Sequence, residues 1–462
     1  MAFHTRVSRT LIAISIAAVL SLAWSILVLR RTGNAESTYY VDSETGMDSN
    51  DGAFKTPWKT IQKAANNLRP GQTVVVQAGT YSERVQVRRS GAAGSPITFR
   101  SQGPVIMGGF TINASYARIV GFDISTVSSA FPDGVGVFIN GSNNEILNNS
   151  IHDTCNEGIW AYGGKARDSV MTSYNTIRGN RIIRAEMTGI MVEGRNSLVE
   201  SNDISHTLQT VPGCSASNDA DGIRYFGRGH TIRKNYVHDI TLTESPSAHI
   251  DATQTWGPAR NIIFEQNVFD IPNDIIPGAT VGLGFTMESI DGQVDGLIIR
   301  NNVFINHYTG YGIDTQTGAG TLLNLTIVNN TFVRVDGYGS GGGGMGIWIT
   351  GRVQNAIVKN NAFYDYGYDG DNYIRVTGGS GVVIGNNSIT KTNGVAPTGS
   401  PYPHDLWMVD AQFVNPAARD FHLRRTSPLI DAGAALPDVT DDLDRVARPQ
   451  RTRSDIGAYE YF

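Results

Sequence analysis

The sequence is short of cysteine and has no surplus of basic residues. Its 37 Lys and Arg residues are outnumbered by 42 Asp and Glu residues, which gives a formal net charge of −5. A chain of this charge lacks the basic surface that nucleic-acid binding requires. Only Cys155 and Cys214 occur. An exported chain could pair them, but nothing in the sequence brings them together, so we predict two free, buried thiols.

The sequence also lacks long helical periodicity, and it has one long hydrophobic run. Glycine is abundant, with 52 among 462 residues against an average of about 7%, which indicates many tight turns. The hydrophobic run is residues 11–29, which are uncharged and followed by Arg30 and Arg31. About 20 such residues span a bilayer, whereas a signal-peptide core is shorter. We therefore predict that residues 1–37 are an uncleaved anchor with a short linker, or alternatively a cleaved signal peptide. Either one exports the rest to the cell surface or extracellular space, and membrane contact is expected only through this segment.

A phrase that ends in asparagine recurs along the chain from residue 144 onward. Successive asparagines are 22 to 35 residues apart, which indicates a stacked array whose units are too small to bury their own apolar faces. Each unit holds short strands divided by Asn and Gly, so we predict an all-β solenoid, a single-stranded parallel β-helix. We interpret the asparagines as structural, taking the left-handed conformation at a sharp corner and bonding from coil to coil. They are Asn149, Asn180, Asn202, Asn235, Asn267, Asn302, Asn330, Asn361 and Asn387.

The two ends of the array carry different patterns. In "KTPWKTIQKAANNLRPG" we expect Thr56 to cap a helix, Pro57 to open it and Gly71 to follow its end. This helix would cover the open end of the coils. The β-helix with its cap is predicted over residues 38–395, and a closing segment over residues 396–462. An acidic cluster in that segment could hold calcium, but a solvated loop is the favoured interpretation; it comprises Asp438, Asp441, Asp442 and Asp444.

Both ends resemble a known superfamily. Residues 39–81 read "YYVDSETGMDSNDGAFKTPWKTIQKAANNLRPGQTVVVQAGTY", and the closing segment contains "SPLIDAG" and "DIGAYEY". Together with the Asn-marked coils, these stretches resemble exported bacterial proteins of the right-handed parallel β-helix, pectate-lyase-like superfamily. The resemblance extends over residues 38–462. It implies a right-handed coil, and a protein that cleaves, epimerises or binds acidic or neutral polysaccharides.

A second strand follows each Asn phrase and exposes alternate residues. We aligned these strands on a buried aliphatic residue, as in "GIWAYGG", "GIRYFGR" and "HIDATQT". The fifth strand, "GFTMESI", could slip by one position. The first predicted outward column is Trp160, Met191, Arg224, Asp251, Thr286, Asp314 and Trp348. The second is Tyr162, Glu193, Phe226, Thr253, Glu288, Gln316 and Thr350.

These columns predict a charged centre flanked by aromatic rings, which suits a sugar chain. Outward charges also keep sheets soluble, so any one residue alone is weak evidence. The predicted catalytic residues are Arg224, His249, Asp251, Glu288 and Asp314. The predicted substrate-binding residues are Trp160, Tyr162, Glu193, Phe226, Gln254, Gln316 and Trp348. Asp219 and Asp221, on the approach to Arg224, are candidate calcium ligands.

Several activities fit this centre. The first is a lyase that cleaves a uronate-containing polysaccharide by β-elimination, with Arg224 and His249 as base and charge stabiliser in either order and with calcium as a candidate cofactor. The second is a glycoside hydrolase that pairs Asp251 with Glu288 or Asp314. A C5-epimerase and a non-catalytic, sugar-binding surface protein are further alternatives. In each case we expect a monomer whose partner is a polysaccharide.

A third column follows the Asn phrases. It reads His152, Asp153, His206, His238, Asp239, Asp270, His307 and Asp365. Stacked His and Asp could bind a metal, but solvated corner residues that bond to turn amides are the favoured interpretation.

Overall fold

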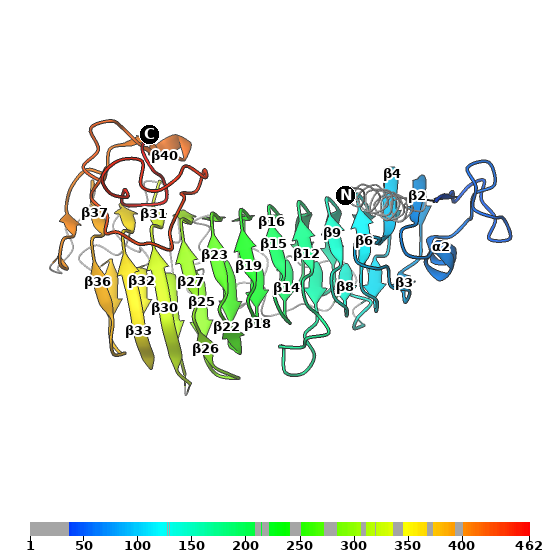
Figure 1. Ribbon diagram of the computed structural model, residues 1–462, viewed down its shortest axis with the longest axis horizontal. Coiled ribbons are helices and arrows are strands. Elements are labelled where there is room, and N and C mark those ends of the chain that lie inside the picture. The colour runs from blue at the N-terminus through cyan, green and yellow to red at the C-terminus, as the bar shows by residue number, and fades with distance from the viewer. Residues whose placement is uncertain are drawn as a thin grey trace, which may run out of the picture.

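The chain folds as a long solenoid of parallel strands (Figure 1). This computed structural model describes residues 37–462 except 127, 129, 208–213, 215–220, 241–250, 272–283, 306–310, 319, 336–344, 367–372 and 393–400. The coils run in sequence order from the blue N-terminal cap to the orange and red C-terminal segment. Among the described residues, no helix combines the length and apolar character needed to cross a bilayer. The run at 11–29 lies outside them.

One face of the solenoid is an 11-stranded parallel sheet that follows chain order. Its strands are short because each supplies only one edge of a coil. They are β3 (Val85–Val87), β5 (Phe110–Ile112), β8 (Val137–Ile139), β11 (Ile159–Ala161), β14 (Ile190–Val192), β17 (Ile223–Tyr225), β21 (Thr253–Thr255), β25 (Phe285–Glu288), β29 (Tyr311–Gln316), β32 (Met345–Ile349) and β35 (Ile374–Val376).

The rest of the wall is a 27-stranded sheet that bends at the Asn corner. It opens with β1 (Thr38–Val41), β2 (Thr73–Tyr81) and β4 (Ile97–Met107). Before the corner lie β6 (Ala117–Val120), β9 (Glu145–Leu147), β12 (Thr176–Arg178), β15 (Leu198–Glu200), β18 (Gly227–Arg228), β19 (Thr231–Arg233), β22 (Ala259–Arg260), β23 (Ile263–Glu265), β26 (Val294–Asp295), β27 (Ile298–Arg300), β30 (Leu322–Val328), β33 (Val353–Lys359) and β36 (Val383–Gly385). After it lie β7 (Asp123–Ile124), β10 (Ser150–Thr154), β13 (Arg181–Ala185), β16 (Asp203–Ser205), β20 (Tyr236–His238), β24 (Val268–Asp270), β28 (Val303–Ile305), β31 (Thr331–Val333), β34 (Ala362–Tyr364), β37 (Ser388–Thr390) and β38 (Leu406–Trp407).

The nine recurring asparagines form a continuous buried ladder, as predicted. The backbone N–H of each of the first eight donates to the side-chain oxygen of the asparagine one coil later, from Asn149 to Asn180 at 3.0 Å through to Asn361 to Asn387 at 3.0 Å, and the N–H of Asn387 donates to Asp405 Oδ1 at 2.8 Å. The left-handed conformation, however, belongs to the preceding residue, such as Asn148 (φ 53°) or Ser201 (φ 55°). The sharp turn and the ladder bond are therefore made by neighbouring residues.

The interior is a stack of aliphatic and aromatic side chains, one layer per coil. Towards the C-terminal end four phenylalanine rings stack nearly face to face, with centroids 5.1 Å apart for Phe269 and Phe304 and 4.7 Å apart for the next two pairs. Such burial supplies most of the folding energy in a solenoid, where each unit contacts only its neighbours.

A short helix caps the N-terminal end, but it starts later than predicted. Helix α2 (Ile61–Asn67) has Thr60 as its N-cap, whose hydroxyl accepts from the Lys63 N–H at 3.1 Å, and Leu68 as its C-cap. Thr56 instead donates to Asp51. The prediction of the cap was wrong by four residues because both threonines precede helix-compatible sequence.

The closing segment folds back over the outer surface of the last coils (Figure 1). It contains β39 (Phe413–Asn415), a 3₁₀ turn at Pro416–Ala418 and β40 (Asp420–Leu423). Its apolar residues form a second core with outward residues of β28, β31 and β34. Within the acidic cluster, Asp442 is buried and accepts from the N–H groups of Asp444, Val446 and Glu460. For Asp442, the solvated-loop interpretation is therefore wrong.

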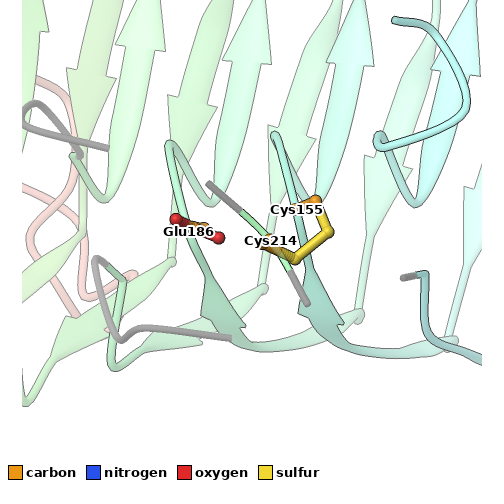
Figure 2. A group of neighbouring side chains, drawn as sticks. All are labelled: Cys155, Glu186 and Cys214. Atoms are coloured by element: carbon orange, nitrogen blue, oxygen red, sulfur yellow. A yellow bond between two sulfur atoms is a disulfide. The ribbon is translucent and has the colours of Figure 1, made fainter. Parts of the chain in front are cut away.

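The two cysteines form a disulfide, so the prediction of free thiols was wrong. Cys155 and Cys214 are 59 residues apart in sequence, but their Cα atoms lie 5.2 Å apart. Figure 2 shows the bond beside Glu186, whose carboxylate lies within 4.8 Å of the sulfurs. Because the sulfurs are bonded to each other, this group lacks the thiolates that a metal would bind.

Two of the corner histidines bond to neighbouring carboxylates and not to turn amides, so the favoured interpretation was wrong about their partners. His152 lies between Asp153 at 2.7 Å and Asp123 at 2.8 Å. His238 lies between Asp239 at 2.6 Å and Asp203 at 3.1 Å. His307 lies outside the described residues.

Candidate functional site

The outward residues of the 11-stranded sheet form a ladder with one rung per coil. The register confirms most of the predicted first column, including the uncertain fifth strand, but Arg224 pairs with Gln254 and not with Asp251. The observed ladder is Gln86, Thr111, Phe138, Trp160, Met191, Arg224, Gln254, Thr286, Asp314, Trp348 and Arg375.

The predicted alignment of the fourth strand was wrong by three positions. It was made on an aliphatic residue, whereas the position directly before each strand, at the corner of the coil, requires a small residue. A Cβ at Gly222 would lie 2.4 Å from the Val237 side chain and 2.6 Å from the Ala252 carbonyl oxygen. Ala252 takes the place of Gly222 in the next coil, since Ile223 N–H donates to the Ala252 oxygen at 3.1 Å. "DATQTW" therefore lies beside "DGIRYF".

The correction moves Asp251 from the ladder to the corner. Its backbone N–H donates to Asp221 Oδ1 at 2.8 Å, and its side chain is buried. The same shift changes the second column. Thr253 pairs with the buried Ile223, so it does not belong to that column. Its place is taken by Trp256, whose ring centroid lies 4.7 Å from that of Phe226. The other members of that column keep their predicted places, with Glu288 paired to Gln316.

A cleft of about 480 Å³ lies over β11, β14, β17 and β21. It unites four predicted site residues, Trp160, Tyr162, Glu193 and Arg224, with groups that the sequence analysis did not select. Its lining residues are Phe131, Asn156, Glu157, Trp160, Tyr162, Gly164, Lys165, Arg167, Met187, Met191, Glu193, Arg224 and Trp256.

Two carboxyl groups in the cleft have raised pKa values. Glu157 is 3% exposed, and burial, helped by the charge of Glu193 and opposed by Arg224, raises its pKa to about 7. Burial also raises the pKa of Glu193, although the Gly163 N–H donates to it at 2.7 Å and Arg167 lies 3.7 Å away. Near neutral pH Glu157 therefore exchanges a proton readily, and Glu193 also holds a proton more tightly than an exposed glutamate does.

A buried cation lies beside these carboxyls. Arg224 Nε donates to Asp221 Oδ2 at 2.5 Å, and both side chains are buried. The Arg224 guanidinium also lies 5.2 Å from the centroid of the Trp256 ring. The ion pair with Asp221 therefore fixes the orientation of the Arg224 guanidinium beside these carboxyl groups.

A second cation comes from the turn after β11. The Arg167 guanidinium lies over the rings of Phe226, at 3.9 Å, and Trp256, at 4.5 Å. Asp168 anchors this turn by ion pairs to Arg195 at 2.8 Å and to Arg228. Phe226, predicted to bind substrate, is fully buried and instead supports Arg167 and Trp256.

Aromatic rings form the other wall of the cleft. Phe131, 56% exposed, packs against Trp160 with ring centroids 5.1 Å apart and against Phe138 at 5.2 Å. Trp160 and Tyr162 lie 5.5 Å apart. Phe131 was missed because it lies in a turn outside the aligned strands.

Asp314 and Glu288 do not line this cleft. Asp314 is three rungs from Arg224 along the ladder, or about 14 Å. It is 2% exposed; burial, with a smaller contribution from the charge of Glu288, raises its pKa to about 6. The predicted single charged centre is thus divided between the cleft and a more distal position on the ladder.

Of the two candidate calcium ligands, Asp221 belongs to the described residues. Asp219 and His249 lie outside the described residues. Both carboxylate oxygens of Asp221 already accept hydrogen bonds, from Arg224 and from the Asp251 N–H. Binding of calcium to Asp221 would have to displace these donors.

Comparison with known proteins identifies relatives of this architecture. Residues 39–177 match the family model described as Pel9A-like, right handed beta helix region. Over 355 residues the chain is 25% identical to the uncharacterized protein YwoF of Bacillus subtilis (strain 168), covering 70% of this chain and 74% of that protein.

Solved structures with the same fold include enzymes. Pectate lyase Pel9A superposes with a TM-score of 0.57 at 19% identity, over 93% of this chain and 97% of that one. The complex of XylC with xylose gives 0.56 at 12%, over 91% and 98%. The PL6 family alginate lyase AlyGC gives 0.52 at 15%, over 88% and 60%. At these identities the likeness concerns the fold.

Proposed function

We propose that the cleft of this parallel β-helix protein, whose residues 39–177 match the Pel9A-like right handed beta helix region, cleaves a uronate-containing polysaccharide by β-elimination. One observation carries this proposal. In a protein of net charge −5, three cations, Lys165, Arg167 and Arg224, gather in one aromatic-walled cleft with two carboxyl groups of raised pKa. Cations hold the carboxylate of an acidic sugar, and aromatic faces stack on its ring.

Each step of β-elimination has a candidate group in the cleft. Arg224 and Arg167 neutralise the sugar carboxylate and stabilise the charge that develops when the neighbouring C–H proton leaves. Glu193 takes this proton, the C–O bond to the leaving sugar breaks, and Glu157 gives its proton to the departing oxygen. The products are an unsaturated sugar and a new chain end. The protein returns to its starting state when a proton passes from Glu193, through solvent, to Glu157.

Hydrolysis is the second candidate, and the same carboxyl pair favours it. A glycoside hydrolase needs one protonated and one charged carboxyl group, which Glu157 and Glu193 supply. In that reaction Glu193 would activate water or attack the sugar carbon. Glu157 would be the acid in both reactions.

A product assay separates these chemistries. We would incubate the protein with pectate, alginate and xylan and record ultraviolet absorbance together with reducing ends, with and without a chelator. Absorbance of an unsaturated uronate establishes β-elimination, and its loss on chelation gives calcium a role. Reducing ends without absorbance establish hydrolysis. Products in neither assay would refute both, and retention of the protein by a polysaccharide gel would then leave a binding function.

The His249→Ala variant tests one of the two orders left open by the sequence, in which His249 is the base and Arg224 the charge stabiliser. If Glu193 removes the proton, this variant keeps its activity and Glu193→Gln loses it. The opposite result assigns the base to His249.

We also propose that the protein acts outside the cell, tethered by residues 11–29. Fractionation of producing cells tests this: recovery in the membrane fraction with a protease-accessible β-helix supports the tether, and recovery in the medium supports a cleaved signal.

A further inference from the structure

Beyond the cleft, the outward ladder continues towards the C-terminal end through polar rungs. After Arg224 come Gln254, Thr286, Asp314 and Trp348 on successive coils. These rungs belong to one sheet and point to the same side as the cleft residues. At about 4.8 Å per coil, Trp348 is about 19 Å from Arg224.

Two of these rungs hold buried oxygen atoms that find no donor within the described part of the chain. Gln254 is 5% exposed and its Oε1 accepts no hydrogen bond there. Asp314 is 2% exposed; its Oδ2 accepts from Gln316 Nε2 at 2.7 Å, whereas its Oδ1 accepts none. Buried polar atoms are nearly always hydrogen-bonded, because leaving one unsatisfied destabilises the fold. A ligand with several hydroxyl donors can satisfy both of these acceptors, because they lie on one ladder.

The ladder then reaches an aromatic ring held in a fixed orientation. Trp348 is half-buried, and its indole N–H donates to Thr377 Oγ1 at 2.9 Å. Arg375, on the next rung, lies with its guanidinium carbon 5.8 Å from the centroid of the Trp348 ring. A fixed indole face beside a cation suits the ring of an acidic sugar.

We propose that these rungs are a distal subsite, in which Gln254 and Asp314 accept hydrogen bonds from sugar hydroxyls and Trp348 stacks on a sugar ring further along the same chain. This inference rests on the proposed function. It adds that the protein engages several consecutive sugar units on the C-terminal side of the cleft, and so discriminates between substrates by chain length. Hydroxyl groups supply the donors that the two buried acceptors lack.

The first experiment compares Trp348→Ala with wild type on graded oligosaccharides of pectate and alginate. Loss of one stacking contact weakens binding by about tenfold. We expect KM to rise by that factor for oligosaccharides long enough to reach Trp348, and to stay unchanged for short ones. The control is Phe54→Ala, which removes an exposed ring from the N-terminal cap. It should leave KM unchanged for long and for short oligosaccharides. Equal KM values for wild type and Trp348→Ala at every length would overturn the inference.

The second experiment uses Gln254→Leu, which replaces the unsatisfied acceptor by an apolar side chain of similar size. We expect an unfolding temperature equal to or above that of wild type, because no native hydrogen bond to Oε1 is lost, together with weaker retardation in gels that contain pectate or alginate. Unchanged retardation would show that Gln254 does not contact the glycan. If wild type itself is active on none of the polysaccharides, the proposed function fails; if it is active and the two variants match it, only the subsite fails.

Discussion

Replacing Glu157 by Gln removes the transferable proton from the cleft and keeps the size of the side chain. A positioned acid contributes about 10²–10⁴-fold to the rate, so kcat of Glu157→Gln should fall by a factor in that range while KM changes little. Burial raises the pKa of Glu157 to about 7. The wild-type rate should therefore decline above about pH 7, as Glu157 loses its proton, and the residual rate of the variant should lack this decline.

The same substitution changes stability in a direction fixed by the pKa. In the unfolded chain the carboxyl loses its proton near the ordinary value of 4.5, whereas in the folded chain it does so near 7. Between these values the folded state binds more protons, so the stability of the wild type falls as pH rises and is level above about pH 7. A shift of this size corresponds to on the order of 3 kcal/mol. The variant lacks this loss, so its stability relative to wild type should increase across the same pH range.

The assays are initial rates by both product readouts and denaturant unfolding at pH values from 4 to 9, chosen to bracket the two pKa values. Glu200→Gln is the matched control, because Glu200 is a buried carboxyl paired with Arg233 at 2.7 Å on the other sheet. It should leave the pH profile of the rate unchanged. An active Glu157→Gln variant that kept the decline near pH 7 would refute the assignment of Glu157 as the acid.

Three further predictions concern groups around and beyond the cleft. Asp221→Asn should destabilise the fold by about 3–5 kcal/mol, because it removes one partner of a buried ion pair with Arg224; denaturant unfolding measures this, and a loss below about 1 kcal/mol would contradict it. Replacing Cys155 and Cys214 by Ser removes a cross-link between residues 59 apart in sequence and should lower the free energy of unfolding by up to about 4 kcal/mol. A thiol titration that found two free thiols in the wild-type protein would contradict the presence of the disulfide. Burial lowers the pKa of His422, but two neighbouring aspartates outweigh this effect and leave the pKa raised. The stabilisation that protonated His422 contributes should therefore be complete below about pH 6.5 and lost as pH rises through the folded-state pKa. Thermal unfolding of wild type and His422→Asn checks this, because the variant should lack the pH dependence.

The architecture could be predicted from sequence because each coil repeats the same physical requirement. A solenoid needs one sharp corner and one inter-coil bond per turn, and the run from Asn149 to Asn387 displays that requirement nine times. The ladder positions of Trp160, Arg224, Asp314 and Trp348 followed from it. The alternation of inward and outward residues assigns a face once the corner of the coil is known.

The error at the fourth coil has a physical origin. The alignment used Ile250 as the buried residue, but the buried rung of this strand is occupied by Thr253, a polar side chain with no exposed surface. The true marker was the acidic residue followed by a small one, as in Glu157-Gly158, Asp221-Gly222 and Asp251-Ala252. That marker would also have identified Glu157.

Other cleft residues could not have been predicted from the repeat. Arg167 and Phe131 lie in turns whose lengths differ from coil to coil, so no periodic position identifies them. Arg167 reaches the rings of Phe226 and Trp256 only because Asp168 is held by Arg195 and Arg228. Such contacts depend on how the turn folds across its neighbours, which is a tertiary property.

The location of the cleft can be understood from the energetics of the solenoid. The coils from β11 to β21 bury Glu157, Glu193, Asp221, Arg224 and Asp251, and such groups are costly to remove from water even when paired. In a repeat protein, stability is close to a sum of local terms, so distant coils cannot fully offset this cost. The Cys155–Cys214 disulfide joins two of these coils, and Cys155 is two residues from Glu157. A covalent cross-link is thus placed beside a group of buried charged side chains, where the proposed chemistry requires fixed geometry.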